Sequence, residues 1–316
     1  MKTTAPTVTA ERMADIRLAV RTACPLPSVA VMLVHGMGSS SRYWGPNLGP
    51  LATRYPLVAP DLLGFGHSPK PSESAYTPAN HAAALASVAQ TAGRPIIVVG
   101  HSTGALLALH LAVAYPMLVR GVVLISLPLF TSEREAREQM ARSSLLTWLQ
   151  VRHLRAAAAM CWLMCHARPV VRLLMPALDR AVSPDVARDA VEHTWRSASL
   201  TVEHVILQTR PIQLLNQLPP ERLLLIHAAD DPVAPMGAVA DYAEGHPGAH
   251  LLRLSDGGHH PYLRRQAETC AAIAAFVEQL STTAGLPAAH GNDTECEKDN
   301  QHDTYQRPDP EKVPHT

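Results

Sequence analysis

The chain has 316 residues, of which 47% are hydrophobic and 17% are charged. This composition excludes a chain that is disordered throughout, and the length allows about two domains with a large buried core. Lys plus Arg and Asp plus Glu each number 27, so the formal net charge is zero. A nucleic-acid-binding protein would show a basic excess, so no nucleic-acid partner is expected.

Five cysteines are scattered along the chain, at positions 24, 161, 165, 270 and 296. An odd number without regular spacing is unlike a disulfide framework, and reduced thiols predict a cytoplasmic location. Cys161 and Cys165 would share a helix face, but no second pair at ligand spacing accompanies them, so we interpret them as core residues and expect no metal site. No apolar stretch follows the N-terminus and no uninterrupted apolar run reaches about 18 residues, so neither a signal peptide nor stable membrane insertion is expected.

In the first part of the chain, short apolar runs alternate with helical patterns. We expect a pair of strands before residue 29, then strands over 29–34, 57–60, 96–99 and 122–126, with helices over 81–91 and 104–115. Continuously apolar strands that alternate with helices are typical of a parallel sheet that helices cover on both faces.

The alternation stops between residues 128 and 218, where several helices, broken by Pro169, Pro176 and Pro184, are expected. Strands resume over 223–226 and 251–254, and a helix over 268–280 follows. The predicted organisation is therefore an α/β core over 1–128 and 218–280 and an all-helical insertion over 129–217. Residues 281–316 are strongly polar and are expected to form a disordered tail.

Gly100-His101-Ser102-Thr103-Gly104 is the most informative motif in the chain. It directly follows the predicted strand 96–99 and opens the predicted helix. A G-x-S-x-G sequence in this setting indicates a nucleophile elbow, in which the serine hydroxyl stands exposed above the sheet. The alternative is an ordinary glycine-rich turn between a strand and a helix.

Here the sequence resembles the α/β-hydrolase fold family, and two further segments agree with it. His35-Gly36-Met37-Gly38 follows the first predicted strand of the sheet, and the segment that begins at Asp61 looks like the family's D-x-x-G-x-G-x-S. The resemblance implies that the backbone N–H groups of Met37 and Thr103 form an oxyanion hole. His35 is expected to brace its loop, and we assign no chemistry to the Asp61 segment.

The resemblance also implies an acid and a base, which follow the serine in the order acid, then histidine. In His227-Ala-Ala-Asp-Asp-Pro-Val-Ala-Pro235, alignment on the last proline makes Asp231 the acid, with Asp230 as the alternative. In Asp256-Gly-Gly-His-His-Pro261 the base is His259, with His260 as the alternative. Ala228 departs from the glycine that is usual in the family.

The helical insertion lies where members of this family carry a cap over the active site. Its apolar residues suggest a pocket for which we name His260, Met160, Trp162 and Met164 as candidates; packing between cap helices is the alternative for the last three. Residues 156–164 would also suit contact with a membrane surface, although a cap helix is the simpler interpretation. Arg196 would pair with a substrate carboxylate or form a surface salt bridge.

The sequence thus predicts a capped serine hydrolase that cleaves a carboxylic ester of a small to medium apolar substrate through Ser102, His259 and Asp231. No metal or organic cofactor is required. Thioesterase, lactonase and C–C bond hydrolase activities are the enzymatic alternatives. A ligand receptor built on the same fold is the alternative from another class. The sequence does not specify the oligomeric state.

Overall fold

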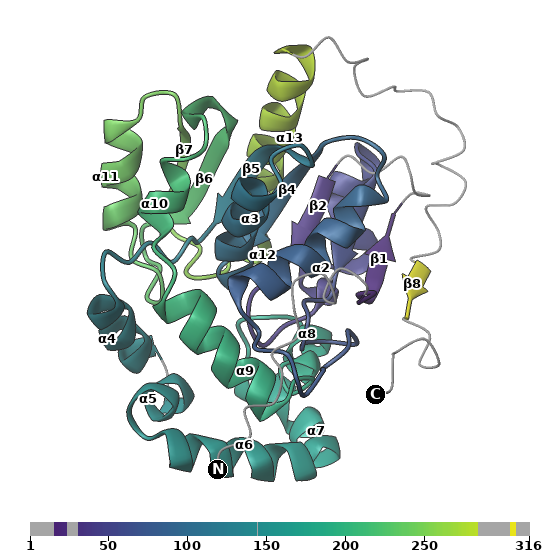
Figure 1. Cartoon of the computed structure of the whole chain (residues 1–316), viewed down its shortest axis with the longest axis vertical. Coiled ribbons are helices and arrows are strands. Elements are labelled where there is room, and N and C mark those ends of the chain that lie inside the picture. Colours follow the sequence, from purple (N-terminus) through teal and green to yellow (C-terminus); the bar gives the residue numbers. More distant parts are fainter. Residues whose placement is uncertain (1–15, 24–30, 144, 284–303, 308–316) are drawn as a thin grey trace.

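A computed structural model describes residues 16–23, 31–143, 145–283 and 304–307 (Figure 1). Its strands are β1 (Val20–Thr22), β2 (Val31–Val34), β3 (Leu57–Pro60), β4 (Ile96–His101), β5 (Val119–Ile125), β6 (Leu223–Ala228), β7 (His250–Leu254) and β8 (Thr304–Gln306). They form one sheet in the order β7-β6-β5-β4-β2-β3-β1-β8. The strands from β7 to β3 are parallel to their neighbours, whereas β1 pairs antiparallel with β3 and with β8.

Helices connect the parallel strands and cover both faces of the sheet. The α-helices are α2 (Pro78–Gln90), α3 (Thr103–Ala114), α4 (Glu133–Ser143), α5 (Leu145–Arg152), α6 (Leu154–His166), α7 (Arg168–Leu178), α8 (Pro184–Asp189), α9 (Trp195–Thr201), α10 (Pro211–Leu215), α11 (Gly237–Gly245), α12 (Pro261–Arg264) and α13 (Gln266–Thr283). Short 3-10 turns cover Ser41–Trp44, Pro46–Leu48, Pro50–Thr53 and Pro220–Arg222, and a π-helical segment covers Val202–Leu207.

Successive residues of each central strand belong to two different cores. In β2, Met32 and Val34 pack into the core that contains α2 and α3, whereas Val31 and Leu33 pack into the core that contains α13. Side chains alternate across a strand, so a strand that is buried on both faces must be apolar at every position. This explains why the strands appear in the sequence as unbroken apolar runs.

The chain order creates a crevice at one edge of the sheet. From β2 the chain passes to β3 on one side, and then to β4, which lies on the other side of β2. The loops that leave the carboxyl ends of β2 and β4 therefore diverge, and ligands of open α/β sheets bind at such a switch point. The loop after β2 begins at His35, and the turn after β4 contains Ser102.

Between β5 and β6 the described chain is helical, from α4 to α10, in agreement with the predicted all-helical insertion. Figure 1 shows helices α4 to α7 in the lower part of the view, away from the sheet. Helix α9 begins with a capping box, in which Thr194 and Ser197 bind each other's backbone amides. Of the proline breaks, Pro184 begins α8, whereas Pro176 lies inside α7, so the expected break at Pro176 is wrong. That helix ends two residues later, at Leu178, so the ring disturbs only its last turn.

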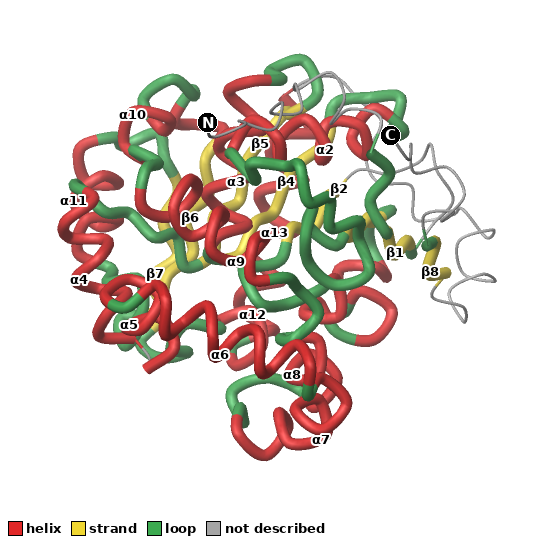
Figure 2. The backbone as a smooth tube through the Cα atoms, turned by 60° about the horizontal axis from the view of Figure 1, so that its bottom comes forward, coloured by secondary structure: helices red, strands yellow, loops and turns green. Residues whose placement is uncertain are grey.

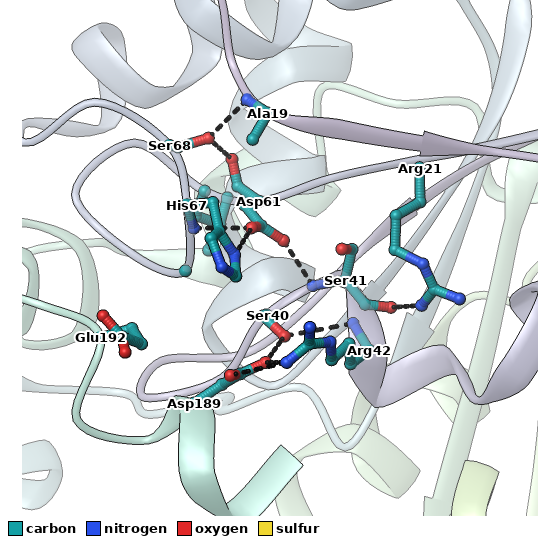
Figure 3. A network of polar contacts seen from close by, with 12 residues as sticks. Ala19, Arg21, Ser40, Ser41, Arg42, Asp61, His67, Ser68, Asp189 and Glu192 are labelled. Atoms are coloured by element: carbon teal, nitrogen blue, oxygen red, sulfur yellow. Dashed lines mark hydrogen bonds and ion pairs between the residues drawn. The ribbon is translucent and has the colours of Figure 1, made fainter. Parts of the chain in front are cut away.

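Buried carboxylates connect the insertion to the core (Figure 3). Asp189, at the end of α8, accepts hydrogen bonds from the Ser40 hydroxyl at 2.6 Å and from the Arg42 guanidinium at 3.1 Å. On the core side, Asp61 accepts the backbone N–H groups of Ser41 and His67. The Asp61 segment thus has a structural role in shaping the loop that follows β2.

The two ends of the predicted core need correction. The predicted disordered tail begins at residue 281, but α13 continues to Thr283, and β8 lies within the tail and pairs with β1. The rest of the tail falls outside the described residues. Of the strand pair expected before residue 29, the described part contains β1, whose sheet partners are β3 and β8.

Candidate active site

Ser102 lies in a strained turn between β4 and α3. Its backbone has φ 54° and ψ −119°, a conformation that residues other than glycine rarely adopt. Such a residue costs about 1–3 kcal/mol and persists only where its surroundings enforce it. Here the surrounding backbone is packed closely around the turn. A Cβ at Gly100 would lie 2.3 Å from the Gly104 carbonyl oxygen, and a Cβ at Gly104 would lie 2.3 Å from the Val34 carbonyl oxygen.

Three side chains from separate loops form a continuous series of hydrogen bonds at this turn. The Ser102 hydroxyl oxygen lies 2.9 Å from Nε2 of His259. Nδ1 of His259 lies 3.1 Å and 3.0 Å from the two carboxylate oxygens of Asp231. A carboxylate only accepts, so His259 donates from Nδ1 and its Nε2 is free to accept the serine proton.

Asp231 is held in its orientation by its own loop. The backbone N–H groups of Val233 and Ala234 both donate to its Oδ1 at 2.9 Å. Burial by itself raises the pKa of this carboxyl, but the hydrogen bond and positive charge of His259 and the two backbone amides outweigh it, so the pKa lies below its usual value. The neighbouring Asp230 is exposed and accepts the backbone N–H of Gly258.

The loop after β2 faces the same serine. Gly36, Met37 and Thr103 line one pocket together with Ser102. Thr103 is the first residue of α3, where backbone N–H groups have no acceptor within the helix. His35 is fully buried and braces the loop: its Nδ1 donates to the Gly36 carbonyl, and its Nε2 accepts the Leu62 N–H. Met37 and Thr103 therefore lie beside Ser102 at the same pocket.

His101, the residue before the serine, contacts the backbone of His259. Its Nε2 lies 2.7 Å from the His259 carbonyl oxygen and must therefore carry a proton. Its ring stacks on Tyr43 with 4.5 Å between centroids. Burial and the neighbouring imidazoles of His259 and His260 hold the pKa of His101 well below its usual value. The sequence pattern predicts no role for His101, although its position beside Ser102 is a usable signal.

The serine opens into a pocket of about 250 Å³ between the core and the insertion. The insertion supplies apolar side chains and one carboxylate, that of Asp179, and no Lys or Arg lines this pocket in the described part of the chain. The hydroxyls of Ser39 and Tyr43 and Nδ1 of His260 are buried without a hydrogen-bond partner among the described residues. Such atoms are rare in folded proteins and are often satisfied by water or a ligand. The apolar lining residues from the insertion are Phe130, Met140, Val182, Val186, Ala190 and Ile206.

Of the four pocket residues predicted from the sequence, the structure places only His260 at the pocket. His260 lines the pocket, but Met160, Trp162 and Met164 do not, and the Trp162 side chain is 61% exposed. These three lie on α6, whereas the insertion lines the pocket with residues of α4, α5, α8, the π-helical segment and the loops beside α4 and α8. Helix periodicity identifies apolar positions but does not specify which helix of the insertion faces the serine.

Two further expectations concern side chains away from the serine. Arg196 donates to the Ser74 carbonyl and does not line the pocket. Cys161 is buried, with its sulfur 4.0 Å from Nε2 of His193. Within the described ranges, no group of three or more His, Cys, Asp or Glu side chains is arranged to hold a metal ion, and no helix is long and apolar enough to cross a membrane.

Comparison with known proteins identifies the family. A model of the alpha/beta hydrolase fold matches residues 29–266. The chain belongs to this family. Among its α/β-hydrolase relatives is "Probable lysophospholipase BODYGUARD 4" of Arabidopsis thaliana, which is 30% identical over 204 residues. That match covers 57% of this chain and 46% of the relative, so the chain spans less than half of the relative's length.

Solved α/β-hydrolase structures share the fold over most of the chain. The esterase RhEst1 from Rhodococcus sp. ECU1013 has a TM-score of 0.64 and 22% identity, and the match covers 84% of this chain and 99% of that one. The E-2-(acetamidomethylene)succinate hydrolase has a TM-score of 0.65 and 21% identity, with 84% and 96% covered. The comparisons thus identify the family and the fold, and the reaction and its substrate are argued from the site.

Proposed function

We propose that this chain is a serine hydrolase that cleaves a carboxylic ester of a small to medium, predominantly apolar substrate through an acyl-enzyme. The observation that carries this proposal is the series of hydrogen bonds from the Ser102 hydroxyl through His259 to Asp231. A nucleophile, a base and an orienting carboxylate are the three groups that acyl transfer to serine requires.

In the acylation half, the Ser102 oxygen attacks the ester carbonyl carbon while Nε2 of His259 takes its proton. Asp231 holds the imidazole and stabilises its charged form. The carbonyl oxygen becomes negatively charged and accepts hydrogen bonds from the backbone N–H groups of Met37 and Thr103. Each donor fixed at this position contributes about 3–4 kcal/mol to transition-state stabilisation.

Acylation is complete when His259 gives its proton to the leaving alcohol and the ester bond breaks. Water then attacks the acyl-enzyme, with His259 again as the base, and releases the acid and free Ser102. The position of Ser102 at the N-terminal end of α3 adds a favourable helix dipole for the negative charge. No step requires a metal or an organic cofactor.

The pocket supports a neutral substrate with a short to medium acyl group. Its volume of about 250 Å³ lies below the range of about 300–1,000 Å³ that is typical of drug-sized ligands. Asp179 at the pocket wall would repel a substrate carboxylate. For this reason we place ester hydrolysis before cleavage of a C–C bond in an anionic substrate, and keep thioesters and lactones as alternatives. We further propose that the helical insertion, residues 129–217, acts as the cap.

Labelling with a fluorophosphonate probe tests the nucleophile. The wild type should label, and Ser102→Ala should neither label nor retain more than about 10⁻⁴ of the wild-type kcat. The matched control is Ser126→Ala, because Ser126 also has a positive φ (50°) and directly follows the adjacent strand β5. Its hydroxyl has no hydrogen-bond partner in the described part of the chain, so its loss should leave labelling intact.

A substrate panel then separates the remaining functions. We expect p-nitrophenyl acetate and butyrate to have higher kcat/KM than the palmitate ester, and higher than matched thioesters and lactones. A folded wild type that neither labels nor hydrolyses any member of the panel would contradict the proposal. Tight ligand binding in its place, detected as a thermal shift, would favour the receptor alternative.

A further inference from the structure

Two helices of the insertion leave a group of large apolar side chains exposed. Between 51% and 76% of each side chain in this group is accessible. We call this group the α6–α7 patch. Figure 2 shows α7 protruding from the lower edge of the molecule, on the side away from the sheet. The patch consists of Trp162, Leu163, Val170, Leu173, Leu174 and Leu178.

The patch is not explained by packing within the described chain. Helix α7 contains no buried residue, although its sequence alternates apolar and basic positions at helical spacing. A globular protein normally turns the apolar face of such a helix toward its core, so a helix that keeps it outside has a contact surface. The proposed pocket does not use it either, because none of the six residues lines that pocket.

The segment that carries the patch contains basic but no acidic residues. Residues 145–178 contain four arginines and no Asp, Glu or Lys. Arg168 and Arg172 both pair with Glu192, which lies outside this segment. Arg152 and Arg155 are exposed, and neither forms an ion pair with another described residue. Arg152 lies in a surface hollow with Glu133 and Glu138, so Arg155 is the arginine of this segment without a described acidic neighbour. An apolar surface flanked by exposed arginines complements an anionic lipid surface better than it does a second copy of this basic segment.

We propose that the α6–α7 patch docks on an anionic phospholipid bilayer, with α6 and α7 lying in the plane of the interface. The helices have 13 and 11 residues, whereas about 20 are needed to cross a bilayer, so they lie on the membrane and do not span it. Apolar side chains enter the boundary between headgroups and acyl chains, and the arginines bind lipid phosphates.

Docking in this orientation brings the pocket close to the lipid surface. Thr147 on α5 and Asp179, directly after α7, both line the pocket and flank the two docked helices. A substrate that partitions into the membrane would then reach Ser102 without crossing bulk water. The docking itself requires neither an active serine nor the proposed function.

Co-sedimentation with lipid vesicles tests the proposal on the full chain. Vesicles of phosphatidylcholine with about 30% phosphatidylglycerol should bind the protein at least tenfold more tightly than pure phosphatidylcholine vesicles. Raising NaCl from about 0.1 M to about 1 M shortens the screening length from about 10 Å to about 3 Å and should release most of the bound protein. Ser102→Ala should bind like the wild type, which separates docking from catalysis.

Paired variants assign the binding to the patch. Leu173→Ser with Leu178→Ser should weaken binding to anionic vesicles at least tenfold. Arg152→Gln with Arg155→Gln should weaken it about 30-fold, from about 1 kcal/mol per arginine. The controls are Met117→Ser, which removes an 83% exposed apolar side chain between α3 and β5, and Arg222→Gln, beside the amino end of β6. Both controls should bind like the wild type.

Three results would overturn the proposal. The first is equal binding by wild type and both patch variants, at unchanged thermal stability. The second is the absence of wild-type binding to anionic vesicles. The third is a wild-type dimer that Leu173→Ser with Leu178→Ser converts to monomer without any effect on lipid, which would assign the patch to a second copy of the chain.

Discussion

At the scale of single residues, the site depends on which of two adjacent candidates faces the serine. The chain presents Asp230 beside Asp231 and His259 beside His260, and in the structure the two members of each pair have different contacts. Asp231 faces His259, whereas Asp230 accepts a hydrogen bond from the backbone of Gly258, directly before the histidine. His259 contacts Ser102, whereas His260 lines the pocket wall. The preference for Asp231 and His259 agrees with this geometry, and their catalytic roles remain predictions.

The two aspartates provide a matched test. Asp231→Asn keeps the shape of the side chain but removes the acceptor that fixes the His259 tautomer, and should lower kcat about 10⁴-fold with little change in KM. Asp230→Asn retains an oxygen that can accept the Gly258 N–H and should lower kcat less than about tenfold. Steady-state kinetics on a short p-nitrophenyl ester measures both effects. Equal losses in the two variants would show that Asp231 has no specific part in the reaction.

At the scale of elements, the contact between α8 and the loop after β2 joins the insertion to the core. Asp189 is fully buried, and its charge is met by the Ser40 hydroxyl and by Arg42, which is itself 44% exposed. Met37, one of the proposed oxyanion donors, lies three residues before Ser40 in the same loop. The buried Asp189 carboxylate therefore joins the insertion to the loop that follows β2, which Asp61 holds from the core side (Figure 3).

Removing this charge should loosen both elements. Asp189→Asn should lower the free energy of unfolding by about 1–3 kcal/mol, because it weakens hydrogen bonds at a buried site. The control is Asp185→Asn on the same helix, where the ion pair with Arg188 is exposed and contributes less than about 1 kcal/mol. Urea unfolding of both variants gives the comparison. If Asp189→Asn costs no more than Asp185→Asn, the buried contact does not hold the insertion.

At the scale of the whole molecule, buried imidazoles make stability depend on pH. Burial lowers the pKa of His81 to about 3 and those of His110, His193 and His260 to about 4. In the unfolded chain these groups titrate near 6.5. The unfolded state therefore binds more protons than the folded state below about pH 6.5, and stability is lost as the pH falls through this range.

Each such imidazole should lower the free energy of unfolding by about 1.4 kcal/mol for each unit that the pH falls between pH 6.5 and about pH 4.5. This window lies above the range in which Asp61 and Asp231, whose pKa values are lowered, would add to acid unfolding. His81→Gln should reduce the slope of unfolding free energy against pH by about 1.4 kcal/mol per unit. His153→Gln, at an exposed position, is the control. A slope that is unchanged in His81→Gln would contradict this account of acid sensitivity.

The sequence by itself determined the elements of the core and the order of the motifs. A strand buried on both faces must be apolar throughout, and a nucleophile elbow requires small residues where Gly100 and Gly104 approach the backbone. These are local requirements, and they leave a readable pattern. The tertiary structure alone decided which insertion residues face Ser102, that Trp162 points to solvent, and that β8 joins the sheet beside β1. These outcomes depend on contacts between segments that are distant in the chain. An apolar residue in a helix gives the same sequence pattern whether it contacts the core, a substrate or a membrane.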